Sequence, residues 1–179
     1  MPVFGHGRRA ALALGGGMLL CACAAAGANM SGELATVPSV DLKRYLGTWH
    51  EIARYPNSFQ KRCYRSTATY SLRDDGDIKV VNACRKDRPD GEEKSIEGKA
   101  WVVDKATNAK LKVRFFWPFS GKYWIIDLGK DYEYAVVGEP GRGYLWILSR
   151  TPTMDDKVFE GIAGRLRLNG YDPSKLVRQ

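Results

Sequence analysis

The stretch of sequence that decides the fold is residues 46–55, LGTWHEIARY. It carries Thr, Trp, Ile and Tyr, residue types that favour an extended strand. Further runs of roughly 6–9 residues follow it, and clusters of Gly, Pro, Asp and Ser between the runs signal turns. Together with the first run they make eight predicted strands: Gly47–Tyr55, Ser66–Arg73, Ile78–Arg85, Lys94–Val103, Ala109–Trp117, Lys122–Leu128, Tyr132–Gly138 and Tyr144–Ser149.

The connections between these runs are short, which favours strands that pair with their neighbours in sequence. An eight-stranded meander can close on itself, because closure leaves no unpaired edge strand. After the last run the period changes, and Val158, Phe159, Ile162 and Leu166 fall on one face of a helix. We therefore predict an all-β fold: an eight-stranded antiparallel up-and-down β-barrel with one C-terminal α-helix packed outside.

The predicted helix spans Met154–Leu168. Thr153 and Asp156 have the spacing of a capping box at its start, and Gly170 follows its last turn. Its apolar stripe is expected to cover the outside of the barrel.

The amino-terminal residues read as a targeting segment. Arg8 and Arg9 precede the apolar run Ala10–Leu20, which is too short to span a membrane but fits a signal peptide. The run ends in Leu-Cys-Ala-Cys-Ala, which resembles the bacterial lipobox with Cys23 as the acylated residue. The expected organisation is a signal peptide at 1–22, a lipidated tether at 23–37 and a barrel domain at 38–179. A plain secretory signal cut near Ala22, Ala24 or Ala26 remains the alternative.

Two cysteines, Cys63 and Cys84, lie within the predicted barrel. An exported chain meets an oxidising compartment, where a pair of cysteines is more often bridged than free. A disulfide closing this 21-residue separation is worth about 3 kcal/mol in the loop-entropy model. We predict the bridge; two buried thiols are the alternative.

The composition argues against catalysis and against a metal centre. The chain has two histidines, and removal of the signal peptide leaves only His50. One histidine cannot build a multi-His metal site or a pair of catalytic imidazoles. Glu51 adjoins His50 but faces the other side of a strand, and no nucleophile motif or phosphate-binding loop is present. We predict a protein that is not an enzyme and holds no metal or cofactor.

Three short motifs, in this order on an eight-strand-plus-helix pattern, resemble the lipocalin family. They are Gly47-Thr48-Trp49 in the first strand, Asp131-Tyr132 before the seventh, and Arg150 after the eighth. The resemblance covers about residues 38–179 and is greatest to bacterial outer-membrane lipoprotein lipocalins (the Blc type, related to apolipoprotein D). It implies that Arg150 lies over Trp49 as a structural plug at the closed end, with Cys63 and Cys84 at the open end. Ala24 after the lipidated cysteine resembles an outer-membrane address.

Strand alternation predicts which side chains line the barrel. Those in phase with Arg150 and with one another are mostly apolar, and an apolar tunnel with few polar groups suits an acyl chain. The predicted ligand-binding residues are Tyr70, Val80, Asn82, Val113, Phe115, Tyr123, Val137, Tyr144 and Trp146; alternation also directs Leu72 inward.

The loops at the open end are basic. Nine Lys and Arg residues stand there against five acids, and we expect Lys61, Arg62 and Arg65 to attract an anionic head group. The alternative is that these cations simply form a solvated rim.

The sequence therefore predicts a lipid-binding lipoprotein of a Gram-negative outer membrane, anchored by Cys23 with its barrel facing the periplasm. Its expected ligand is a fatty acid or lysophospholipid, held non-covalently for storage or transport. A carrier of a pigment or haem-like compound and a scaffold protein are the alternatives. A homodimer is compatible with the sequence. Nucleic acid is not an expected partner, because the positive charge is spread and export removes the target.

Overall fold

The computed structural model describes residues 1–2 and 32–179. The expected signal peptide, the lipobox with Cys23 and most of the expected tether lie outside these residues. None of the helices in the described part of the chain is long and apolar enough to cross a membrane.

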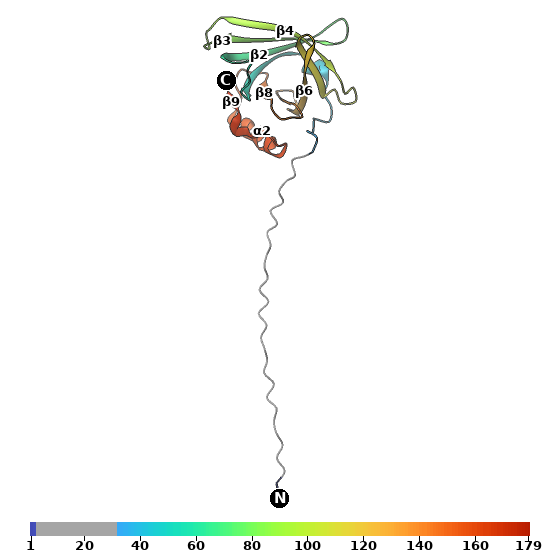
Figure 1. The fold of residues 1–179 in the computed structure, drawn as a ribbon, viewed down its shortest axis with the longest axis vertical. Coiled ribbons are helices and arrows are strands. Elements are labelled where there is room, and N and C mark those ends of the chain that lie inside the picture. Colours follow the sequence, from blue (N-terminus) through green and yellow to red (C-terminus); the bar gives the residue numbers. More distant parts are fainter. Residues whose placement is uncertain (3–31) are drawn as a thin grey trace.

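The core of the structure is a closed antiparallel β-barrel (Figure 1). Each strand pairs with the next in sequence, and β8 also pairs with β1, so the eight-stranded sheet closes as predicted. The strands are β1 Gly47–Arg54, β2 Cys63–Leu72, β3 Ile78–Lys86, β4 Glu93–Val102, β5 Lys110–Phe116, β6 Phe119–Leu128, β7 Tyr134–Gly138 and β8 Leu145–Ser149. The remaining elements are α1 Leu42–Tyr45, α2 Asp156–Leu168, the 3₁₀ helix η1 Pro173–Lys175 and the short strand β9 Val177–Arg178.

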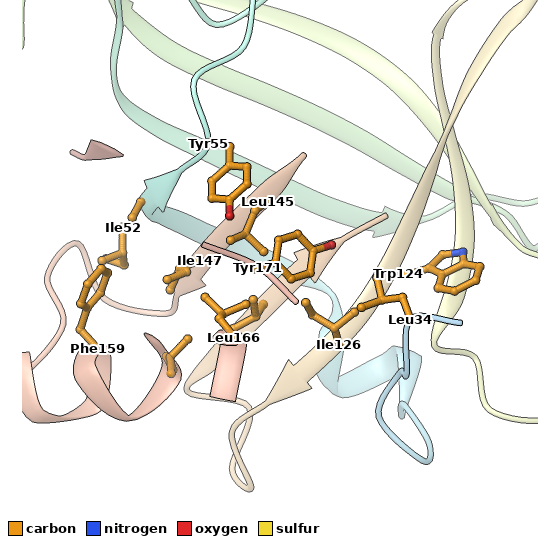
Figure 2. Close-up of a cluster of buried hydrophobic side chains, with 13 residues drawn as sticks. Leu34, Ile52, Tyr55, Trp124, Ile126, Leu145, Ile147, Phe159, Leu166 and Tyr171 are labelled. Carbon is orange, nitrogen blue, oxygen red and sulfur yellow. The ribbon is translucent and has the colours of Figure 1, made fainter. Parts of the chain in front are cut away.

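Helix α2 packs outside the barrel, as its apolar stripe predicts. Phe159, Ile162 and Leu166 are buried against the outward-facing residues Ile52 and Ile147 of the sheet. Figure 2 shows Phe159 and Leu166 of the helix together with Ile52 and Ile147 of the strands. The inner cluster, which includes Trp49, lies inside the barrel. The protein thus has two apolar cores, one on each face of the sheet.

The predicted helix start was wrong. Asp155 is the N-cap residue, and its carboxylate accepts hydrogen bonds from the backbone N–H groups of Lys157 and Val158. The helix therefore begins at Asp156 rather than Met154, and Thr153 with Asp156 forms no capping box. Asp is among the strongest N-cap residues, so the adjacent Asp155 takes the position.

The chain packs against the barrel before residue 38. Leu34 is buried in the outer core, and the backbone N–H of Val37 donates to the carbonyl of Ile125. Residues 32–37, which fall within the expected tether, therefore lie against the barrel. The chain then reaches the closed end, where Val40 joins the inner core and α1 follows.

Strand β1 changes partners along one of its edges. Residues Gly47–His50 pair with β2, but the pairing stops there, and β9 occupies the same edge at Ala53 and Arg54. Strand β2 therefore separates from β1 toward the open end, where residues 55–62 connect them. In the half of the barrel nearer the open end, β1 and β2 are therefore not paired with each other. We call this unpaired stretch the seam, and side chains bridge it.

Candidate functional site

The closed end of the barrel is blocked by Trp49 and Arg150. The Trp49 side chain is fully buried, and the Arg150 guanidinium lies 3.8 Å from the centre of its ring. Arg150 also donates to the carbonyls of Thr48 and Arg44, and the Trp49 indole N–H donates to the carbonyl of Tyr45. The contact that the family resemblance implies is thus present, and it ties β8 to both β1 and α1.

Three tyrosines form a hydrogen-bonded cluster above this block. The hydroxyl of Tyr123 lies 2.7 Å from that of Tyr45 and 2.9 Å from that of Tyr70. Burial raises the pKa of all three phenols, and that of Tyr70 reaches about 12. The cluster is therefore a neutral, polar layer. Tyr123 is one of the predicted ligand-binding residues, but its hydroxyl is engaged in this cluster; Tyr45 was not predicted from the sequence.

The raised pKa values predict that the barrel loses stability in alkali. Burial favours the neutral phenol, so this contribution is complete below pH 10, the ordinary tyrosine pKa. It is lost as the pH rises from 10 toward the folded-state pKa of about 12. We expect the ionisation of Tyr70 alone to lower the free energy of unfolding by about 2 kcal/mol over that pH interval. Urea denaturation at a series of pH values measures this loss. The Tyr70→Phe variant should show a shallower decline, and an equally steep one would contradict the assignment.

The apolar wall above the cluster consists largely of the predicted residues. Seven of the predicted ligand-binding residues belong to the inner core or pack against it: Tyr70, Val80, Val113, Phe115, Tyr123, Val137 and Trp146. Tyr70, Val80 and Val137 are buried within it. Val113, Phe115 and Trp146 face inward yet remain partly exposed.

Two of the side chains directed inward by alternation lie at the rims instead. Leu72 is 65% exposed and belongs to neither core, because β2 extends past the closed end of the barrel and nothing covers its last residue. Tyr144 precedes β8 and is 42% exposed at the open end, where its ring stacks on that of Trp146. Tyr144 can therefore meet a ligand at the entrance but not deep in the barrel.

Strand β4 contributes a residue that sequence alternation did not identify. Gly98 pairs with the inward-facing Val80, and a Cβ atom at Gly98 would come within 2.6 Å of the Phe115 ring. The absence of a side chain lets Phe115 lie against the wall. An isolated glycine inside a predicted strand is a known signal of such close approach.

A buried ion pair lies inside the barrel near the open end. Glu51 and Arg54 are both over nine-tenths buried, and the Arg54 guanidinium is hydrogen-bonded to the Glu51 carboxylate. Glu51 pairs with the inward-facing Leu148, and Arg54 with the inward-facing Trp146, so both point into the barrel. Arg54 also donates to the carbonyls of Gln60 and Cys63, which bridges the seam between β1 and β2.

The loop at residues 55–62 is fastened to this pair by Gln60. Its amide nitrogen donates to Glu51 at 2.7 Å, and its amide oxygen accepts from the indole of Trp146 at 2.9 Å. Phe59, on the same loop, lies 6.3 Å from Trp146 between ring centres. The loop therefore covers part of the entrance, held by polar contacts to the inner wall.

Two polar atoms of the inner wall have no hydrogen-bond partner within the described residues. They are the hydroxyl oxygen of Ser66 and the amide oxygen of Asn82, and both are buried. Asn82 alternates with the inward-facing Val80 and pairs with Ala68, so it points into the barrel as predicted. Buried polar atoms normally have partners, which makes these two available to a group inside the barrel.

The predicted mouth residues are exposed at the open end, and the rim around them is largely paired. Four of its acids bind four of its cations, in the pairs Arg62–Asp87, Arg85–Glu93, Arg88–Asp90 and Lys94–Glu92. Among the predicted mouth residues, Arg62 is engaged in this way, whereas Lys61 and Arg65 form no ion pair within the described residues. The surplus positive charge of the rim is therefore carried by the cations outside these four pairs, and Lys61 and Arg65 are among them.

The predicted disulfide is confirmed. Cys63 and Cys84 are bonded, with their Cα atoms 5.4 Å apart, where β2 and β3 reach the open end. The disulfide joins β2, which separates from β1 at this end of the barrel, to its other neighbour β3. Within the described residues, no three His, Cys, Asp or Glu side chains are placed to hold a metal ion.

Comparison with known proteins is consistent with this geometry. The model of the Lipocalin-like domain family matches residues 40–179. The outer membrane lipoprotein Blc of Escherichia coli K12 is 46% identical over 145 residues, covering 80% of this chain and 81% of that protein. Apolipoprotein D of Macaca fascicularis is 37% identical over 147 residues, covering 76% and 75%.

Among solved structures, insecticyanin from the tobacco hornworm superposes with a TM-score of 0.66 at 21% identity, covering 83% of this chain and 84% of that one. This likeness concerns the fold alone. The family match spans most of the chain, and these two relatives are 46% and 37% identical to it over the aligned residues. The chain therefore belongs to the lipocalin family, and it is a binding protein rather than an enzyme.

Proposed function

We propose that this protein is an outer-membrane lipoprotein that binds one fatty acid or lysophospholipid in its barrel. The observation that carries this is the inner wall: apolar side chains line the barrel above the block formed by Trp49 and Arg150, and Val113, Phe115 and Trp146 among them are only partly buried. A barrel lined in this way can accept an acyl chain and leave a polar head group at the entrance. The similarity to Blc supports the outer-membrane assignment.

Acylation of Cys23 would hold the barrel close to the bilayer, on the periplasmic side of the membrane. Several acyl chains on one residue anchor a protein stably, whereas one chain does not. A tethered lipid carrier in this position could store or move single-chain lipids during membrane maintenance.

The head group would lie against the basic rim. Lys61 and Arg65 supply unpaired positive charge there, Arg62 adds its own beside Asp87, and Ser66 and Asn82 offer uncompensated hydrogen-bonding atoms just inside. Together they suit a head group that carries a negative charge and also a hydroxyl group, which can donate to the Asn82 amide oxygen.

A lipid titration tests this function. Residues 31–179, with the disulfide intact, are titrated with lysophospholipid, fatty acid and diacyl phospholipid while tryptophan fluorescence is followed, and native mass spectrometry counts the bound lipids. We expect saturable one-to-one binding of single-chain lipids and weaker binding of two-chain lipids. Trp146→Ala should reduce affinity, because Trp146 faces the barrel interior and its indole N–H donates to Gln60.

Neutralising Lys61, Arg62 and Arg65 together should lower affinity for anionic single-chain lipids by about tenfold and leave a neutral monoacylglycerol unaffected. Unchanged affinity for anionic lipids would remove the head-group role of these residues.

Absence of binding by any lipid, in a protein shown to be folded and empty, would overturn the lipid-carrier function. Absorbance of the purified protein would then test a pigment ligand, and the same mass spectra report whether it is a homodimer.

A further inference from the structure

The tip of the β5–β6 hairpin exposes three aromatic side chains to solvent. Phe116, Trp117 and Phe119 are 68%, 82% and 78% exposed, more than any other aromatic residue of the described chain. They follow one another across the turn, with only Pro118 between Trp117 and Phe119, and they contribute to neither apolar core. A soluble domain seldom leaves such a cluster uncovered unless the cluster meets a partner.

The charged side chains of the same hairpin are basic from its tip down to Asp127, which lies near the closed end of β6. Residues 105–126 include five Lys or Arg and no Asp or Glu. Nearest the tip, Lys112 and Lys122 are paired across β5 and β6, and Arg114 lies on the same outer face. None of these three forms an ion pair within the described residues. Like charges opposite each other on a sheet are destabilising, so this arrangement costs the fold some stability.

Exposed aromatic rings next to unpaired cations match the chemistry of a lipid bilayer surface. Trp and Phe rings are favourable at the level of the head groups, and Lys and Arg bind anionic head groups at the surface. A second copy of this chain fits less well, because hairpin against hairpin would bring two sets of unpaired cations together. The charge therefore selects an anionic lipid surface as the partner.

We propose that the β5–β6 hairpin docks the barrel onto a bilayer that contains anionic phospholipid. Phe116, Trp117 and Phe119 enter the interfacial layer, and Lys112, Arg114 and Lys122 lie against head-group phosphates. The hairpin turn lies at the open end, together with the loop at residues 55–62, so docking brings the entrance of the barrel to the bilayer surface. This contact is independent of the amino-terminal anchor, which fixes the chain to the membrane without orienting the barrel.

Fluorescence quenching tests the proposal on the full chain as purified from the membranes of cells that express it. The protein is reconstituted with vesicles whose phospholipids carry bromine near the glycerol end of the acyl chains. The difference in quenching between the parent and Trp117→Phe isolates the signal of Trp117. We expect Trp117 to be quenched in vesicles of phosphatidylcholine with phosphatidylglycerol. The quenching should fall in phosphatidylcholine alone and at high salt, because salt screens the attraction.

Charge and aromatic variants separate the two parts of the hairpin. Lys112→Gln with Arg114→Gln and Lys122→Gln should abolish the dependence on phosphatidylglycerol. Phe116→Ser with Phe119→Ser should reduce the quenching of Trp117 in both vesicle types. Leu72→Ser, Val103→Ser and Leu168→Ser, combined in one protein, remove three exposed apolar side chains elsewhere and should change nothing.

Two results would overturn the proposal. The first is a Trp117 signal that stays unquenched in anionic vesicles to which the protein is bound. The second is a Trp117 shielded by a second copy, shown by cross-linking through the hairpin. Lipid titration in solution, without vesicles, reports on the barrel ligand alone, so failure of docking and failure of the proposed function are distinguishable. Unchanged circular dichroism shows that each variant is folded.

Discussion

Replacing Trp49 by Ala is expected to lower the free energy of unfolding by about 4 kcal/mol. The Trp49 side chain is fully buried at the closed end, and neighbouring strands cannot move into the space without breaking the barrel ladder. The variant also removes the surface on which Arg150 lies and the hydrogen bond to the carbonyl of Tyr45. Urea denaturation followed by circular dichroism measures the loss.

Arg150→Met is the matched control for Trp49→Ala. It keeps an apolar cover over the ring but removes the cationic contact and the bonds to the carbonyls of Thr48 and Arg44. Since Arg150 is partly exposed to water, a loss of about 1 kcal/mol is expected. A loss as large as that of Trp49→Ala would show that the arginine, rather than the buried indole, holds the closed end together.

Replacing Glu51 by Leu is expected to cost about 3–5 kcal/mol, because it leaves the Arg54 guanidinium buried without its counter-charge. The same substitution removes the acceptor for the Gln60 amide, so the loop at residues 55–62 loses one of its fastenings. Denaturation measures the stability, and proteolysis at the loop measures its release.

The double variant Glu51→Leu with Arg54→Met should recover most of that stability, since paired buried charges often contribute no more than apolar residues of similar size. A double variant as unstable as Glu51→Leu alone would argue that Arg54 acts chiefly by bridging the seam to the carbonyls of Gln60 and Cys63. The two outcomes separate charge compensation from strand bridging.

Most of the architecture was predictable because successive side chains along a strand point to opposite faces of the sheet. Eight β-prone runs with short turns specified the meander. The residues predicted to face the inside of the barrel do so in strands as far apart in sequence as β3 and β8. The helix was predictable from its apolar spacing, but its start depended on which of several adjacent residues capped it. Sequence spacing cannot decide between Thr153 and Asp155, since both types cap helices.

Several polar residues of the site were missed, and a bulge accounts for one of them, Arg54. Glu51 shares the phase of Trp49, so alternation could have directed it inward. Arg54 is out of that phase, and it points inward only because the register of β1 shifts between Glu51 and Ala53. Such a bulge leaves no clear mark in the sequence. Tyr45 and Gln60 were missed for a related reason: both lie outside the predicted strands, and only the closed fold brings them to the inner wall.

The seam between β1 and β2 has a consequence for engineering the entrance of this barrel. In most of the sheet, moving two strands apart breaks a row of backbone hydrogen bonds. At the seam, β9 already satisfies the edge of β1, and the contact with β2 runs through the side chain of Arg54. The aperture is thus determined by exchangeable side chains rather than by strand number. Variants at Gln60, or at Arg54 together with Glu51 so that no buried charge is left unpaired, are the changes expected to enlarge it for bulkier cargo while the backbone ladder stays intact.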